Sequence, residues 1–222
     1  MTKLEALHAE LIGCRRCKRL VAWREEVAQV KRRAYREQEY WGRPVPGFGD
    51  PRAKLLVVGL APGAHGANRT GRVFTGDRSG DFLYAGLHRA GFANQPQATG
   101  RDDGLKLKGA FVTVPVRCAP PDNKPTPIEI AKCQPWFDRE WELLKPKAVL
   151  ALGAIAWRAV LERLEWPRPW PDFAHGAEAR AEGKPVLLGC YHVSQQNTQT
   201  GRLTEKMFDQ VMQVARARLS EA

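Results

Sequence analysis

The sequence predicts an α/β fold, a three-layer α/β/α sandwich with a central four-stranded parallel sheet. Two observations predict it. Short runs rich in β-branched residues occur at 54–59, 110–116, 147–152 and 185–191, and segments with helical periodicity lie between them. Strands that alternate with helices require a parallel sheet covered on both faces. The 222 residues suffice for one domain with a substantial core, so we expect a single domain over residues 1–222.

The expected helices follow the chain in order. Two lie near the N-terminus, at 4–12 and from 18 to about 36, separated by Gly13 and a Cys-x-x-Cys turn. The second carries many Arg and Lys residues, as a solvated helix face does. A turn-rich stretch at 41–51 precedes the first strand. Further helices are expected at 80–90, 127–144, 153–164 and 203–219.

The charge balance favours a polyanionic partner. Lys and Arg number 35 against 24 Asp and Glu, a formal net charge of +11. Nucleic acid is the commonest soluble polyanion, although a basic enzyme without such a partner fits the composition equally well. The first residues form no secretory segment, and no apolar run approaches the roughly 18 residues that span a bilayer. We therefore expect no membrane segment and a reducing cytoplasm, where the five cysteines are ligands or buried thiols.

Three loops are expected to share one rim of the sheet, because ligands bind beyond the carboxyl ends of parallel strands. They follow Gly59, Val116 and His192. The first loop, 59–77, is rich in glycine, which permits positive φ and close approach of backbone N–H groups to a ligand. It fits neither the dinucleotide-binding nor the Walker pattern. A loop that is merely flexible is the alternative.

Four cysteines form a candidate metal site. Cys14 and Cys17 are a Cys-x-x-Cys pair, whereas fourteen residues separate Cys118 from Cys133. Four thiolates can ligate zinc or a 4Fe-4S cluster, and a single short knuckle favours iron-sulfur over a zinc ribbon. The alternative is a redox pair with two ordinary buried thiols. Cys190 lies in an apolar strand and is expected to be a small core residue.

Four motifs occur in a fixed order: Gly59-Leu-Ala-Pro-Gly63, Val73-Phe-Thr-Gly76, Cys118-Ala-Pro-Pro-Asp-Asn-Lys-Pro-Thr-Pro127 and His192-Val-Ser-Gln-Gln-Asn. With the cysteines between them, they resemble the uracil-DNA glycosylase superfamily, and more narrowly its type 5 or b-type bacterial and archaeal branch. The resemblance runs from Cys14 to about Leu203. It implies hydrolysis of the N-glycosidic bond of uracil, and of other deaminated bases, in DNA. It also implies a structural 4Fe-4S cluster held by Cys14, Cys17, Cys118 and Cys133.

The resemblance implies a role for each residue of the motifs. Phe74 would stack on the extruded base, His192 would donate to the departing base, Asp77 would orient water, and Asn123 would bond the base or the water. The expected base-binding set is Gly59, Ala61, Gly63, Phe74 and Val114. Each residue also has a structural alternative: a core residue for Phe74, a packing residue for His192, a helix N-cap for Asp77 and a turn residue for Asn123.

Two positions depart from the uracil-specific branches. Ala61 stands where those carry an acidic or amide residue, so another group must position the water. Val114 stands where they carry an asparagine that reads the uracil edge, which predicts looser base selection. Because no lysine occupies the proposed catalytic positions, we expect water as the nucleophile and an abasic product without strand cleavage.

The polar segment 192–202 is suited to enter the minor groove and fill the gap left by a flipped nucleotide, and its alternative is a polar surface loop. The residues expected to contact DNA are His65, Lys124, Ser194, Gln195, Gln196 and Asn197. We expect a monomer that acts on DNA containing deaminated bases in a prokaryotic cytoplasm. Two other functions fit the sequence: a non-catalytic nucleic-acid-binding module with a structural zinc site, and a hydrolase of small nucleosides.

Overall fold

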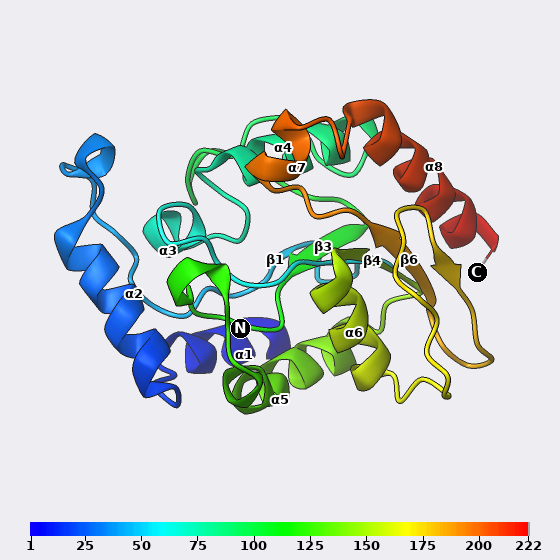
Figure 1. The fold of residues 1–222 in the computed structure, drawn as a ribbon, viewed down its shortest axis with the longest axis horizontal. Coiled ribbons are helices and arrows are strands. Elements are labelled where there is room, and N and C mark those ends of the chain that lie inside the picture. Colours follow the sequence, from blue (N-terminus) through cyan, green and yellow to red (C-terminus); the bar gives the residue numbers. More distant parts are fainter. Residues whose placement is uncertain (222) are drawn as a thin grey trace.

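The computed structural model describes residues 1–221, in which one sheet lies between two helical layers (Figure 1). The strand order is β1-β3-β2-β4-β6-β5, and β3, β2, β4 and β6 are parallel. The strands are β1 (Phe48–Gly49), β2 (Leu55–Val58), β3 (Ala110–Thr113), β4 (Ala148–Leu152), β5 (Glu178–Ala179) and β6 (Val186–Cys190). The predicted α/β/α fold with four parallel strands is confirmed. The antiparallel edge strands β1 and β5 were not predicted, because two residues carry no periodic signal.

The helices are α1 (Lys3–Ile12), α2 (Lys18–Val30), α3 (Ala67–Thr70), α4 (Arg78–Arg89), α5 (Pro127–Leu144), α6 (Ala154–Arg163), α7 (Gln195–Gln199) and α8 (Glu205–Glu221). The expected helix from 18 to about 36 is wrong at its end. Lys31 adopts a φ of 56° and stops α2, and only a 3-10 turn at Arg33–Tyr35 follows. The short helices α3 and α7 lie in segments that were expected to be loops.

Alternating side chains of the strands fill two cores. Leu55 and Val57 of β2 face the layer of α4 and α8, whereas Leu56 and Val58 face α5 and α6. Figure 1 shows these helix pairs on opposite sides of the sheet. Both faces of the central strands are thus buried, which explains their continuous β-branched and leucine runs.

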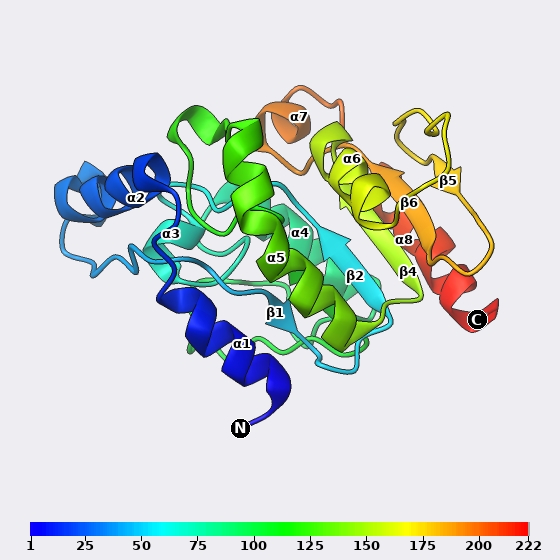
Figure 2. The same cartoon turned by 90° about the horizontal axis from the view of Figure 1, so that it is seen from below.

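The N-terminal helices extend one side of this sandwich. Apolar side chains of α1 pack against Cys133 and Trp136 of α5, and Figure 2 shows α2 lying beside α3. No helix within residues 1–221 is long and apolar enough to cross a membrane.

Candidate active site

A cavity of about 410 Å³ opens at the carboxyl ends of the parallel strands. It is the candidate active site and is called the active cavity below. Its volume lies in the range of about 300–1,000 Å³ that is usual for small-ligand pockets. It is lined by Leu60, Ala61, Pro62, Gly63, Val73, Phe74, Asp77, Ser79, Val114, Asn123, Leu152, Gly153, Ala154, Ile155, His192 and Ser194. The structure therefore brings all three predicted catalytic residues together. The segment after β4, 153–155, also lines the cavity and was not predicted, since it carries no polar side chain.

Phe74 forms an aromatic wall of the cavity. Its backbone lies in the left-handed region at a φ of 49°, which is unusual for a bulky residue. Its ring centroid is 6.2 Å from that of His192. Gly59 was expected to bind the base, but it is not among the residues that line the cavity. A Cβ on Gly59 would lie 2.5 Å from Cζ of Phe74, so this glycine makes room for the ring.

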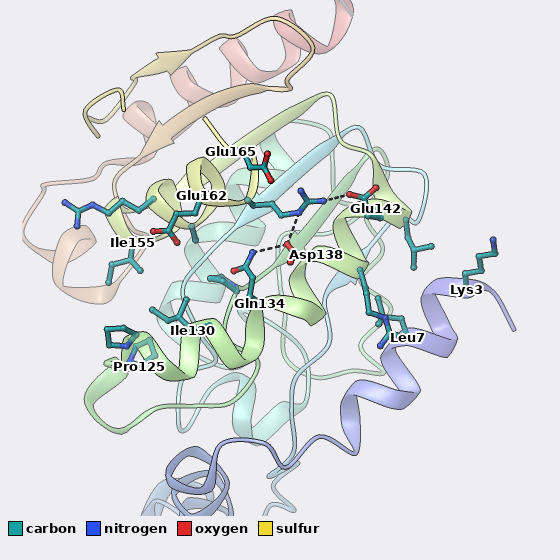
Figure 3. A pocket seen from close by; sticks show the side chains of 18 residues that line it. Lys3, Leu7, Pro125, Ile130, Gln134, Asp138, Glu142, Ile155, Glu162 and Glu165 are labelled. Atoms are coloured by element: carbon teal, nitrogen blue, oxygen red, sulfur yellow. Dashed lines mark hydrogen bonds and ion pairs between the residues drawn. The ribbon is translucent and has the colours of Figure 1, made fainter. Parts of the chain in front are cut away.

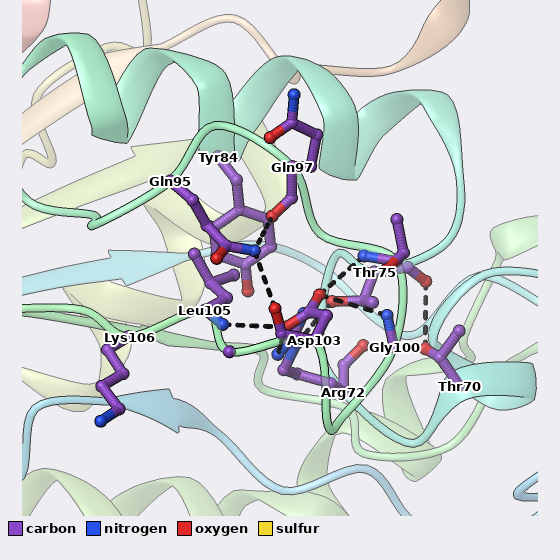
Figure 4. A network of polar contacts seen from close by, with 12 residues as sticks. Thr70, Arg72, Thr75, Tyr84, Gln95, Gln97, Gly100, Asp103, Leu105 and Lys106 are labelled. Carbon is purple, nitrogen blue, oxygen red and sulfur yellow. Dashed lines mark hydrogen bonds and ion pairs between the residues drawn. The ribbon is translucent and has the colours of Figure 1, made fainter.

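The residues on either side of Phe74 are fixed by hydrogen bonds, and Figure 4 shows the one between Thr70 and Thr75. The carbonyl of Val73 accepts from Oη of Tyr84 at 2.8 Å. The carbonyl of Thr75 accepts from Oγ1 of Thr70 at 3.1 Å. Both residues that flank the strained Phe74 are thereby held in place.

A buried ion pair supports the same loop. Arg72 donates through Nε to Oγ1 of Thr75 at 3.0 Å and through Nη1 to Oδ1 of Asp103 at 2.9 Å. The Asp103 carboxylate also accepts from the backbone amides of Thr99 and Leu105. Burial opposes its charge, yet these hydrogen bonds hold the pKa of Asp103 well below its usual range. The pair thus ties the 99–105 loop to the segment that carries Phe74.

The two carboxylate oxygens of Asp77 have different surroundings. Its Oδ1 accepts from the backbone N–H of Gly80 at 3.0 Å, so it is the N-cap of α4, as the structural alternative expected. Its Oδ2 lies over two glycines, since a Cβ would be 3.0 Å away on Gly63 and 1.9 Å away on Gly66. Burial raises the pKa of the Asp77 carboxyl. The cap orients the side chain so that it also borders the cavity.

His192 follows β6 at the cavity wall. The carbonyl of His192 accepts from Nδ2 of Asn197 at 2.8 Å. Gly153 lies close to this histidine, because a Cβ on Gly153 would be 3.4 Å from the Cβ of His192. Burial lowers the pKa of the His192 imidazole, which favours the neutral ring. Asn123 lines the same cavity from a 3-10 turn, where it adopts a φ of 55° and remains exposed.

The residues expected to contact DNA differ in their surroundings. Gln195, Gln196 and Lys124 are exposed. The amide of Asn197 is instead engaged with His192, and Ser194 is the N-cap of α7. His65 is half-buried, with Nδ1 3.1 Å from Oη of Tyr40. Burial, Arg32 and Arg69 lower the pKa of the His65 imidazole.

The four predicted ligand cysteines, Cys14, Cys17, Cys118 and Cys133, line one small hollow beside α2 and α5. Cys190 lies apart from them in the core. Within residues 1–221, no three His, Cys, Asp or Glu side chains are placed to hold a single metal ion. Burial raises the pKa of Cys118 to about 12 and that of Cys133 to about 11 when they are free thiols.

A buried guanidinium beside this hollow is positioned to pair with an anionic sulfur. Arg24 is only 2% exposed, donates through Nη1 to Sγ of Cys118 at 2.9 Å and through Nη2 to the carbonyl of Cys14 at 3.2 Å. Its nearest carboxylate, on Glu25, is 3.8 Å away and partly exposed. Because a buried cation needs a negative partner, the donor set suits thiolates that are bound to a metal.

A second buried network was not predicted. Glu140 of α5 accepts from Nη2 of Arg117 at 2.7 Å and from Nε2 of His8 at 2.9 Å, and it also bonds Thr113. Against the effect of burial, Arg117 and His8 hold the pKa of Glu140 at about 2. Since Arg117 precedes Cys118, this network fixes the cysteine segment to α1, β3 and α5.

A hollow larger than this cavity is a groove of about 1170 Å³ along α1, α5 and α6 (Figure 3). An ion pair between Arg163 and Asp138, 2.8 Å apart, crosses it. Ile155 is shared with the active cavity, but none of the predicted catalytic residues borders the groove. The volume of a hollow therefore does not identify the candidate active site.

The fold and the cavity define an α/β protein with a cavity of small-ligand size at the carboxyl edge of its parallel strands. Residues 46–216 match the family model described as the uracil DNA glycosylase superfamily. The chain belongs to this superfamily, as its motifs predicted.

Curated relatives narrow the branch. A type-5 uracil-DNA glycosylase of Mycobacterium bovis is 55% identical over 214 residues, 95% of this chain and 80% of the relative. One from Thermus thermophilus is 53% identical over 213 residues, 96% of each chain. One from Pyrobaculum aerophilum is 45% identical over 207 residues, 93% of this chain and 89% of the relative. The predicted resemblance to the type 5 branch is confirmed.

The buried pair of Arg72 and Asp103 yields a stability prediction. We expect Asp103→Asn to lower the free energy of unfolding by about 2–4 kcal/mol, because it leaves the Arg72 charge buried without a partner. Faster amide hydrogen exchange at 72–76 should accompany this destabilisation. Asp209→Asn is the matched control, since it removes the carboxylate of another Arg–Asp pair whose side chains are 33% and 34% exposed instead of 4% and 9%. Equal destabilisation of the two variants would contradict the assignment.

Proposed function

We propose that this protein is a DNA repair glycosylase that hydrolyses the N-glycosidic bond of uracil in DNA, releasing the free base and leaving an abasic site. The observation that carries the proposal is the cavity that collects Phe74, Asp77, Asn123 and His192 at the strand ends. A base inside a duplex is out of reach, so the nucleotide must be flipped into this cavity. The net charge of +11 favours the approach of DNA through counterion release.

The cavity can bind the base and stabilise it as it leaves. The flat face of Phe74 offers a stacking surface for the flipped base. As the C–N bond breaks, negative charge develops on the base, and the N–H of the neutral His192 ring can donate to it. The amide of Asn123 can bond the base edge or the water. These donors act in a partly dehydrated site, where hydrogen bonds to a developing charge are strongest.

We assign Asp77 to orienting the water that attacks the sugar. Its N-cap bond fixes the carboxylate, and Asp77 lines the cavity with Oδ2 close to Gly63, another lining residue, where it can orient a water toward the sugar. Ala61 also lines the cavity but has only a methyl group. Among the described residues that line the cavity there is no lysine, which supports water as the nucleophile and an uncleaved strand.

The range of deaminated bases that the enzyme accepts is proposed to depend on Val114. Its apolar side chain lines the cavity at the position where an amide would read the uracil edge, so other deaminated bases should also be accepted. We assign Gln195 and Gln196 of α7, together with Lys124, to contacts with DNA, and their exposure supports this assignment. We propose that the protein acts as a monomer in a prokaryotic cytoplasm.

The cysteine hollow is proposed to hold a 4Fe-4S cluster through Cys14, Cys17, Cys118 and Cys133. When bound, the cluster supplies four metal–thiolate links and no redox step. The cysteines themselves come from the α1–α2 turn, the segment after β3, and α5, so these three segments are fastened together. Arg24 supports the assignment because its buried charge faces sulfur.

Substitutions in the cavity test the enzymatic roles. We expect Asp77→Asn, Asn123→Ala and His192→Ala each to lower kcat for uracil excision about 10²- to 10³-fold, the usual effect of removing one positioned polar group. Single-turnover excision from a uracil-containing oligonucleotide measures this. Gln213→Ala serves as the control because it changes an exposed polar residue of α8 that lies outside the cavity. Near-normal turnover of all three variants would remove the site assignment, and excision of uracil by none of the proteins would remove the function.

Serine substitutions test the cofactor. Purified wild-type protein should show broad absorbance at about 400 nm, as thiolate-ligated iron does. We expect Cys118→Ser to lose this absorbance together with iron and sulfide. Cys190→Ser, which alters a buried cysteine outside the hollow, should keep them. A colourless wild-type protein that contains zinc alone would contradict the proposal.

A further inference from the structure

A second polar hollow, of about 420 Å³, adjoins the active cavity. We name it the Trp41 hollow, and it is lined by Gln38, Glu39, Tyr40, Trp41, Arg43, Arg69, Thr70, Thr99, Gly100 and Arg101. The backbone N–H of Gly76 donates to the carbonyl of Ala98 at 3.2 Å, and Nη2 of Arg69 donates to the carbonyl of Gly76 at 2.6 Å. Because Gly76 lies between Phe74 and Asp77, a single loop separates this hollow from the active cavity.

Two guanidinium groups are held on one indole ring in this hollow. Cζ of Arg101 is 4.4 Å, and that of Arg43 is 5.7 Å, from the ring centroid of Trp41. The ring itself is fixed. Its Nε1 donates to the carbonyl of Pro44 at 3.0 Å, and a Cβ on Gly71 would lie 2.9 Å from its Cδ2. The cation–π contacts therefore hold both arginines in place before any ligand arrives.

The charges of Arg43 and Arg101 are not neutralised within the protein. Both side chains are exposed, and within residues 1–221 neither forms an ion pair with a carboxylate. The third arginine, Arg69, is occupied by the carbonyls of His65 and Gly76 and by Gln38. Glu39 contributes the one carboxylate of the lining, so positive charge is in excess. The hollow thus suits an anion that accepts hydrogen bonds from guanidinium groups, as a phosphate does.

We propose that Arg43 and Arg101, held on Trp41, bind a backbone phosphate of the DNA a few nucleotides from the flipped base. This proposal rests on the proposed function for the identity of the polyanion. Each strand of duplex DNA advances about 3.4 Å per nucleotide, so a few nucleotides span the single loop between the two hollows. The phosphate site would anchor the strand on the outer side of the loop whose inner side carries Phe74 and Asp77.

The salt dependence of DNA binding tests the proposal. The double variant Arg43→Gln/Arg101→Gln should bind a uracil-free duplex roughly tenfold more weakly at low salt, and the slope of log K against log[KCl] should become shallower by about 0.9 for each phosphate that the variant no longer neutralises. Fluorescence anisotropy over a KCl series measures both. Arg168→Gln is the matched control, because this exposed guanidinium also stacks on an indole, 3.7 Å from the Trp170 ring centroid, but lies beyond the end of α6 and outside both hollows. It should bind like wild type.

An unchanged slope in the double variant, or an equally shallow slope in Arg168→Gln, would overturn the phosphate site. Uracil excision by the wild-type protein is scored separately on a uracil-containing duplex. If the wild type releases no uracil while the double variant still shows the shallower slope, the proposed enzymatic function fails and the phosphate site stands. If uracil is released but the slope does not change, the function stands and the phosphate site fails.

Discussion

The active cavity depends on the backbone of one residue, Phe74, held in the left-handed region at a φ of 49°. Such a conformation costs about 1–3 kcal/mol for a residue with a side chain, so the surroundings must enforce it. Gly59 leaves room for the ring, and Gly80 leaves room for the Phe74 carbonyl, which a Cβ there would approach to 1.9 Å. Tyr84 binds the preceding carbonyl. These contacts together hold the strained backbone and keep the Phe74 ring at the wall of the cavity.

The polar groups of the site are oriented by bonds that also serve the fold. Asp77 caps α4 with Oδ1, and its Oδ2 lies beside Gly63, which lines the cavity with it. The side-chain amide of Asn197 holds the carbonyl of His192 just beyond the end of β6. Because these groups are fixed before substrate arrives, little reorganisation is needed as charge develops. The Asn197 bond also explains why α7, although short, matters to the site.

The framework of the site was accessible from sequence because its signals are local. β-branched runs predicted the four parallel strands, and the ends of most helices lay within about two residues of the prediction. The ordered motifs led to Phe74, Asp77, Asn123 and His192, which the structure gathers in one cavity. Parallel strands explain this gathering, since their carboxyl ends meet at one edge.

What the sequence did not reveal are contacts between distant residues. Arg24 contacts Cys118 from 94 residues away in the sequence, and His8 contacts Glu140 from 132 residues away. Neither contact produces a periodic pattern in the sequence. Amphipathic patterning treats the charged residues of α2 and α5 as solvated, although Arg24 and Glu140 are buried. The supporting role of Gly59, likewise, depends on a ring that arrives from a loop further along the chain.

These features lead to one claim: the cavity accepts a single flipped base and holds it against Phe74. The most direct measurement is a crystal structure of His192→Ala bound to a duplex that contains one uracil. The account predicts that the uracil lies outside the helix stack, inside the cavity, with its ring parallel to Phe74. A uracil that stays stacked in the duplex, or that binds away from Phe74 in a protein still able to bind the DNA, would contradict it.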